Sequence, residues 1–224
     1  MDWTDELIEL VASSPRIAKH AHVPMQSGSD AVLRRMHRKY RAWHYREKIE
    51  KLRAAMPSAA IGADVMVGFP GETDYEFEDT RRMIEDLPFT YLHVFTYSAR
   101  PGTAAAGMPM QVPAKVARER NRILRELGDQ KKLAFMQDFV GHTLEAITLT
   151  KHRVADTPGV ADAPPRSASP VIDICAGETT EALTDNYLKL HLEGRFKPNL
   201  WLQAKILAVE NHTLMGRLVQ AAFD

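Results

Sequence analysis

The sequence is poor in cysteine, since Cys175 is the single one among 224 residues. One cysteine excludes a disulfide framework and a zinc ribbon, because both need several thiols. It also excludes an iron–sulfur cluster held by several cysteines of this chain. No window approaches 18 consecutive apolar residues, so we expect no transmembrane helix and no membrane partner. The acidic N-terminus lacks the apolar stretch of a secretory signal.

The sequence also lacks a net charge, because 29 Lys and Arg balance 29 Asp and Glu. These charges are unevenly placed along the chain. Residues 34–53 hold nine cations and two acids, residues 64–86 hold eight acids and two arginines, and residues 111–132 are again basic. Basic segments of this kind either bind phosphate backbones or form the solvated face of a helix. The pattern alone leaves both interpretations open.

Up to about residue 138 the sequence alternates between helix-like and strand-like segments. Apolar periodicity and cap signals predict helices at 4–13, from Ser29 onward, at 43–55, after the Thr73-x-x-Glu76 capping box, and at 112–139. We expect the Ser29 hydroxyl to cap its helix. Short apolar runs predict strands at 20–25, 61–69 and 91–97. This order is typical of an α/β fold with parallel strands.

The character of the sequence changes after residue 138. Short strands are predicted at 144–149, 187–192, 200–209 and 214–219. Residues 155–170 are rich in Pro, Ala, Asp and Ser, which predicts a flexible loop. We therefore expect a first domain over 1–138 and a small all-β domain over 139–224.

Loops rich in Gly and small polar residues follow the predicted parallel strands, where α/β folds bind their ligands. Three glycines would let a flat or phosphate-like ligand approach the backbone: Gly28, Gly68 and Gly71. Gln26, Ser27 and Ser29 could hydrogen-bond a ribose or a carboxylate. Arg100 could hold an anion. Each loop taken alone is better explained as a tight turn between a strand and a helix.

Three segments of the chain are recognisable. His22 to Met36 (beginning HVPMQSGSD), Asp64 to Thr73 (DVMVGFPGET) and Leu92 to Thr103 (LHVFTYSARPGT) resemble the radical SAM tRNA methylthiotransferases. The resemblance covers about residues 4–140, and the β domain is similar to that family's C-terminal TRAM domain. Within the family, residues 89–95 and 108–113 look most like the branch that acts on N6-threonylcarbamoyladenosine in tRNA.

The resemblance implies a partial radical SAM (β/α) barrel of about three parallel βα units. It implies transfer of a methylthio group to carbon 2 of the modified adenosine beside the anticodon, through a radical made from S-adenosylmethionine (SAM). Family members hold two 4Fe-4S clusters with cysteines that this sequence lacks. We therefore expect the C-terminal half of a cytoplasmic, monomeric enzyme, inactive without its N-terminal half.

The resemblance also assigns candidate site residues. The ribose or methionine part of SAM would face Gln26, Ser27 and Ser29. The adenine would be lined by Val67, Gly68 and Phe69. Arg100 and Thr103 would lie at the substrate mouth. The tRNA backbone would contact Arg34, Arg35, Arg38, Arg118 and Arg122. No metal ligand is assigned in this chain.

Two alternatives from other classes remain. The chain could be a catalytically inactive tRNA-binding module, because it lacks the cluster cysteines. It could instead be a metal-dependent barrel hydrolase, because His20-x-His22 places two imidazoles on one face of a strand, with Asp64 and His93 on neighbouring strands. Each histidine taken alone is as easily a hydrogen-bonded packing residue.

Overall fold

The computed structural model describes residues 3–149, 171–173 and 179–221. The chain divides into two compact units, Met1–Ala134 and Phe135–Asp224. The predicted boundary after residue 138 lies just beyond the C-terminal end of the longest helix. The predicted flexible loop at 155–170 lies outside the described residues.

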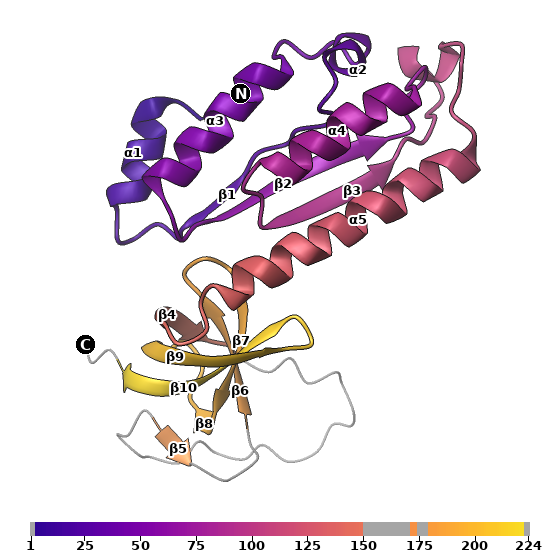
Figure 1. Ribbon diagram of the computed structural model, residues 1–224. Coiled ribbons are helices and arrows are strands. Elements are labelled where there is room, and N and C mark those ends of the chain that lie inside the picture. Colours follow the sequence, from indigo (N-terminus) through magenta and orange to yellow (C-terminus); the bar gives the residue numbers. More distant parts are fainter. Residues whose placement is uncertain (1–2, 150–170, 174–178, 222–224) are drawn as a thin grey trace. The chain divides into compact units, whose positions relative to one another are not determined.

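The first unit is built on a three-stranded parallel sheet, in the order β1-β2-β3 (Figure 1). Its elements, in chain order, are α1 (Asp5–Ser13), β1 (His20–His22), α2 (Asp30–Arg35), α3 (Ala42–Ala55), β2 (Ala60–Val67), α4 (Asp74–Asp86), β3 (Tyr91–Thr96), the short 3-10 helix η1 (Ala104–Gly107) and α5 (Ala114–Gln137). The predicted α/β class and the parallel strand direction are confirmed.

The two faces of this sheet differ in chemistry because side chains alternate along each strand. On β2, Ile61, Ala63, Val65 and Val67 join the apolar core beneath the helices. Figure 1 shows α3 and α4 lying along that face. They supply Tyr45, Ile49, Leu52, Phe77 and Ile84 to the same core. The opposite face carries polar and aromatic side chains, described below.

Local sequence signals explain where two of the helices begin. Thr73 and Glu76 form the predicted capping box, in which the Thr73 hydroxyl accepts from the Glu76 N–H at 3.3 Å and the Glu76 carboxylate accepts from the Thr73 N–H at 2.8 Å. Ser29 is the N-cap of α2, as predicted, but its hydroxyl makes no capping hydrogen bond. That detail of the prediction is wrong. The next side chain, Asp30, accepts a hydrogen bond from the Ala42 N–H at the start of α3.

The second unit is a closed five-stranded barrel, in the order β10-β7-β6-β4-β9. Its strands are β4 (Thr143–Thr148), β6 (Thr179–Thr184), β7 (Lys189–Glu193), β9 (Trp201–Glu210) and β10 (Thr213–Ala221), with a separate pair β5 (Val171–Asp173) and β8 (Arg195–Phe196). All four predicted strands are present, but β5, β6 and β8 were missed. The barrel interior contains Leu190, Leu192, Leu202, Ile206 and Leu214.

None of the helices in the described part of the chain combines the length and the apolar character that crossing a bilayer requires.

Candidate functional site on the parallel sheet

The loop after β1 holds Gln26 in an unusual backbone conformation. Its φ is 66°, in the left-handed region that non-glycine residues rarely adopt. The Gln26 N–H donates to the Asp64 carbonyl at 2.8 Å, and its carbonyl accepts from the Met66 N–H at 2.8 Å. The strained backbone is therefore fixed to β2 on both sides. Such conformations concentrate at functional sites, where they aim a side chain.

The next residues of this loop are locked onto α4. The Ser27 hydroxyl lies 3.1 Å from the Thr80 hydroxyl and accepts from the Ser29 N–H at 3.1 Å. The Gly28 N–H donates to the same Thr80 oxygen at 3.0 Å. A Cβ at Gly28 would come within 2.7 Å of the Thr80 Cα. Gly28 is therefore required for close packing against α4, and both predicted serines are buried in the loop.

The loop after β2 is shaped by a buried ion pair. Glu72 accepts from the Gly68 N–H at 2.6 Å and from Arg120 at 2.7 Å, and its side chain is fully buried. Burial raises the pKa of the Glu72 carboxyl, and the Gly68 N–H and Arg120 oppose that rise. Gly68 has a φ of +76°, and a Cβ there would lie 2.6 Å from the Ala117 Cβ. Gly68 therefore allows α5 to approach this loop.

The aromatic residue of the same loop faces the end of β3. Phe69 packs edge-on against Tyr97, with ring centroids 5.4 Å apart. The Tyr97 hydroxyl is buried and has no hydrogen-bond partner within the described ranges. An unpaired buried hydroxyl is costly and suggests a missing partner. Of the predicted adenine-lining residues, Val67 turns into the apolar core beneath the helices.

The predicted substrate-mouth residues lie on the loop after β3. Arg100 and Thr103 are both exposed. The Thr103 hydroxyl donates to the Arg100 carbonyl at 2.8 Å, which closes a turn. The Arg100 guanidinium forms no ion pair with any residue that the structure describes. It is therefore available for an anion.

The predicted RNA-binding arginines fall into two groups. Arg35 forms a bidentate pair with Glu76 at 3.0 and 2.8 Å. Arg122 pairs with Glu119 and Glu126, each at 2.6 Å. In contrast, Arg34, Arg38 and Arg118 are exposed and make no ion pair with another described residue. The last three are therefore the stronger candidates for phosphate contacts.

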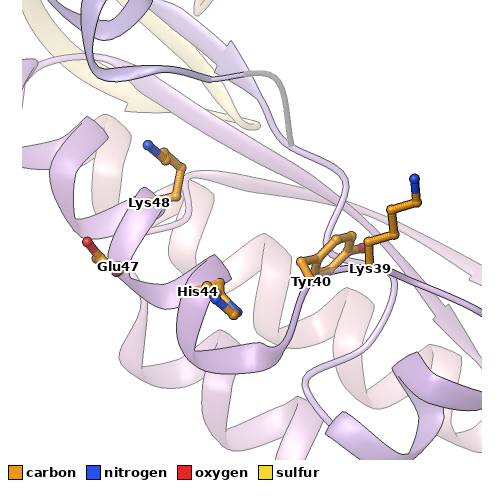
Figure 2. Close-up of a pocket in the computed structure, with 5 residues that line it drawn as sticks. All are labelled: Lys39, Tyr40, His44, Glu47 and Lys48. Atoms are coloured by element: carbon orange, nitrogen blue, oxygen red, sulfur yellow. The ribbon is translucent and has the colours of Figure 1, made fainter.

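A cationic hollow of about 400 Å³ adds residues that the sequence analysis did not single out. It lies at the start of α3, and Figure 2 shows its lining, which consists of Lys39, Tyr40, His44, Glu47 and Lys48. The Tyr40 hydroxyl donates to the Met25 carbonyl at 2.9 Å and so joins the hollow to the loop after β1. The only sequence signal was the excess of positive charge at 34–53.

A second hollow, also of about 400 Å³, lies between β3 and α5. It is lined by Val94, Phe95, Thr96, Arg118, Asn121 and Arg125. Asn121 donates to the Val94 carbonyl at 3.0 Å. Because β3 is an edge strand of this sheet, the hollow combines unpaired strand backbone with two arginines.

The polar face of the sheet gathers the four residues of the metal-dependent hydrolase alternative, namely His20, His22, Asp64 and His93. His22 Nε2 lies 3.2 Å from Asp64 Oδ1, and His93 Nδ1 lies 3.3 Å from the same oxygen. His20 Nε2 lies 2.8 Å from the hydroxyl of Tyr91, a residue that the analysis missed. The alternation of Tyr91, His93 and Phe95 along β3 was the signal that could have found it.

Comparison with known proteins agrees with this architecture. Residues 1–84 match the family model described as the Radical SAM superfamily. Over 146 residues the chain is 44% identical to the tRNA-2-methylthio-N(6)-dimethylallyladenosine synthase of Thermobifida fusca. The aligned segment covers 65% of this chain and 30% of the relative. The enzyme of the same name from Thermus thermophilus is 40% identical over 149 residues, 66% of this chain and 32% of the relative.

The chain thus spans about 30% of the length of these curated relatives. The relatives' names contain dimethylallyladenosine, so the predicted threonylcarbamoyladenosine branch is not confirmed. Residues 1–84 are therefore similar to part of a Radical SAM domain, and about two thirds of the chain is similar to enzymes named for the methylthio modification of tRNA.

Proposed function

We propose that this chain is a SAM- and tRNA-binding part of a cytoplasmic tRNA methylthiotransferase, made of three βα units of a radical SAM barrel and a TRAM-like β-barrel. One observation carries the proposal: the chain is 44% identical over 146 residues to an enzyme named for this modification. The three loops predicted to bind ligand follow the ends of neighbouring parallel strands, which supports a common rim.

The residues of this rim suit SAM. Gln26 offers an amide donor and an amide acceptor on a backbone fixed by β2. Tyr97 is partly exposed and offers aromatic surface for a purine, with the buried Phe69 ring packed edge-on behind it. The remaining predicted residues are buried and would fix the shape of the loops that contact SAM; they are Val67, Gly68, Ser27 and Ser29. When bound, SAM supplies a radical precursor for hydrogen removal from the substrate.

The residues of this chain do not suit an iron–sulfur cluster. Such clusters are held by several cysteine thiolates, whereas the sequence has one cysteine. The chain's own contribution is to bind SAM, to orient it and to hold tRNA.

The unpaired arginines provide the tRNA contacts in this proposal. Arg34, Arg38 and Arg118, with Lys39, would neutralise phosphates, whereas Lys48 is paired with Asp5 at 3.1 Å. Arg100 would lie at the substrate mouth. Of the two candidate substrates, N6-dimethylallyladenosine has the support of the relatives' names, and N6-threonylcarbamoyladenosine has that of the predicted branch.

Binding measurements on the chain test this proposal. Equilibrium dialysis with labelled SAM should show saturable binding that Gln26→Ala weakens and the exposed control Gln137→Ala does not. Mobility shifts should show tRNA binding. Anticodon stem-loops carrying each modified adenosine would identify the preferred substrate. Binding of neither SAM nor tRNA would overturn the proposal.

The second candidate is a tRNA-binding module without SAM chemistry. The single cysteine is the observation that favours it. Tight tRNA binding with no detectable SAM binding in the same experiment would select this candidate.

A further inference from the structure

We propose that His22, Asp64 and His93 form a binding site for one divalent transition-metal ion of the zinc type, on the polar face of the parallel sheet. One ligand atom from each residue lies within 4.8 Å of the other two. The site uses no cysteine and does not depend on the proposed tRNA modification.

The separations between the ligand atoms suit a single ion. His22 Nε2 and His93 Nδ1 lie 3.2 and 3.3 Å from the same oxygen, Asp64 Oδ1. Zinc–nitrogen and zinc–oxygen bonds are about 2.0–2.2 Å long, so two ligands of a tetrahedral ion lie roughly 3.3–3.5 Å apart. The two separations from Asp64 therefore suit a bound ion, and all three ligand atoms lie within 4.8 Å of one another.

Strand register explains why the three side chains meet. Asp64 on β2 stands opposite His93 on β3, and His22 on β1 stands opposite Gly62 on β2. Residues two apart on a strand share one face, so Gly62 and Asp64 lie on the same face of β2. His22 and His93, their partners on β1 and β3, therefore lie on that face too. Each ligand thus comes from a different strand of a hydrogen-bonded sheet, which gives a rigid site.

A hydrogen-bonded second layer supports His22. Its Nδ1 lies 3.2 Å from the Tyr91 hydroxyl, which also lies 2.8 Å from His20 Nε2. A metal at His22 Nε2 requires the proton on Nδ1, so Nδ1 donates to Tyr91 and Tyr91 donates to His20. Metal-bound histidines commonly have such a partner.

Gly62 makes this second layer possible. Tyr91 pairs with Gly62 in the sheet, and a Cβ at Gly62 would overlap the Tyr91 ring. The ring therefore lies across Gly62 and reaches both histidines of β1. The phenol acts as a positioning group, and it does so only because residue 62 is a glycine.

The ligands are accessible to an incoming ion. The side chains of His22, Asp64 and His93 are 32%, 29% and 56% exposed. Three protein ligands leave at least one coordination position open for water or for an anionic group. Two imidazoles and one carboxylate favour zinc, cobalt or nickel over magnesium, which prefers oxygen ligands.

Calorimetric titration of the untagged chain, freed of metal by EDTA, tests the site. We expect ZnCl₂ to bind with one equivalent at the site and MgCl₂ to show no comparable binding. His93→Ala should weaken zinc binding at least about tenfold, and Tyr91→Phe about 10- to 100-fold. Substitution of the exposed His142 by Ala is the matched control and should change nothing. Cobalt bound at the site should show the visible absorption of a tetrahedral ion.

Circular dichroism of each variant separates loss of the site from loss of the fold. Should His22→Ala disturb folding, the isosteric Asp64→Asn variant takes its place. Unchanged zinc affinity in a folded His22→Ala/His93→Ala double variant would overturn the proposal, as would the absence of saturable zinc binding to the unaltered chain. Either result would leave these residues as a hydrogen-bonded packing cluster.

Discussion

Glycines in this protein matter most where another element occupies the space of a side chain. Gly28 is the clearest case, because a Cβ there would lie 2.7 Å from the Thr80 Cα on α4. The neighbouring atom belongs to helix backbone, which cannot move aside as a side chain can. The loop that follows β1 can therefore pack against α4 only because residue 28 has no side chain.

We expect Gly28→Ala to destabilise the protein by about 1–3 kcal/mol, the usual cost of overpacking. Urea unfolding followed by circular dichroism measures this difference. Gly107→Ala is the matched control, because nothing lies within 4 Å of a Cβ at that position. Equal stability of the two variants would contradict the packing argument.

The ion pair between Glu72 and Arg120 couples the loop after β2 to α5. Both side chains are nearly inaccessible, at 0% and 6% exposed. Arg120 also donates to Asp74 at 2.7 Å at the start of α4. Removing one member of such a pair leaves a buried charge without its partner, whereas removing both does not.

We expect Arg120→Leu to destabilise the protein by about 3–5 kcal/mol. Because Glu72→Leu/Arg120→Leu removes both charges, it should cost less than the sum of the two single changes. Denaturant unfolding of all three variants completes the double-mutant cycle. The exposed Arg122→Ala, at a surface ion pair, should cost only about 0–1 kcal/mol. Strict additivity of the two core changes would show that the pair is not coupled.

At the scale of whole elements, α4 carries an ion-pair cluster on its exposed side. Hydrogen bonds from Arg81, helped by Arg82, lower the pKa of Glu78 to about 2 from its ordinary value of 4.5. A carboxyl whose pKa is lowered on folding stabilises the folded state above its ordinary pKa. This contribution is lost as the pH falls through the folded-state value.

We therefore expect part of the stability to decline as the pH falls below about 4.5, and Glu78→Gln to remove that part. Urea midpoints measured at neutral pH and at successively lower pH values give the comparison. Glu9→Gln serves as a control, because Glu9 is exposed and forms no ion pair with the described residues. If Glu78→Gln kept the full acid sensitivity, other carboxylates would be responsible.

Element by element, the sequence predicted what depends on local signals. The capping box at Thr73 and the apolar periodicity located the helices to within a few residues. These signals did not reveal β6, because Thr179–Thr184 has only two apolar side chains, Ala182 and Leu183, and follows a low-complexity stretch. Nor could they predict that Ser29 leaves its cap unused while Asp30 bonds to α3, since that choice depends on the position of another helix.

The candidate site was predictable in composition and less so in geometry. Loop positions pointed to Gln26 and Arg100, and alternation placed His22 and Asp64 on strands. The Tyr91 ring lying over Gly62 follows from strand register, which no single segment encodes. Likewise, the sequence did not predict that Gly68 would pack closely against Ala117 of α5. Tertiary packing decides such contacts, so local reasoning misses them.

At the scale of the whole molecule, the described residues form two apolar cores. One gathers residues of α1, α3, α4, α5 and the parallel sheet, and the other lies inside the β-barrel. Ile49 and Leu190 are fully buried, one in each core. A core of its own is what lets a unit unfold as a cooperative body.

We expect Leu190→Ala to destabilise the barrel by about 2–5 kcal/mol and Ile49→Ala to do the same to the first unit. Hydrogen exchange read by mass spectrometry assigns each effect, because peptides from 4–134 and from 179–221 report on different units. Each substitution should speed exchange mainly in its own unit. If either substitution speeded exchange equally in both units, the chain would unfold as one cooperative unit, and the stabilities of its two cores would be coupled.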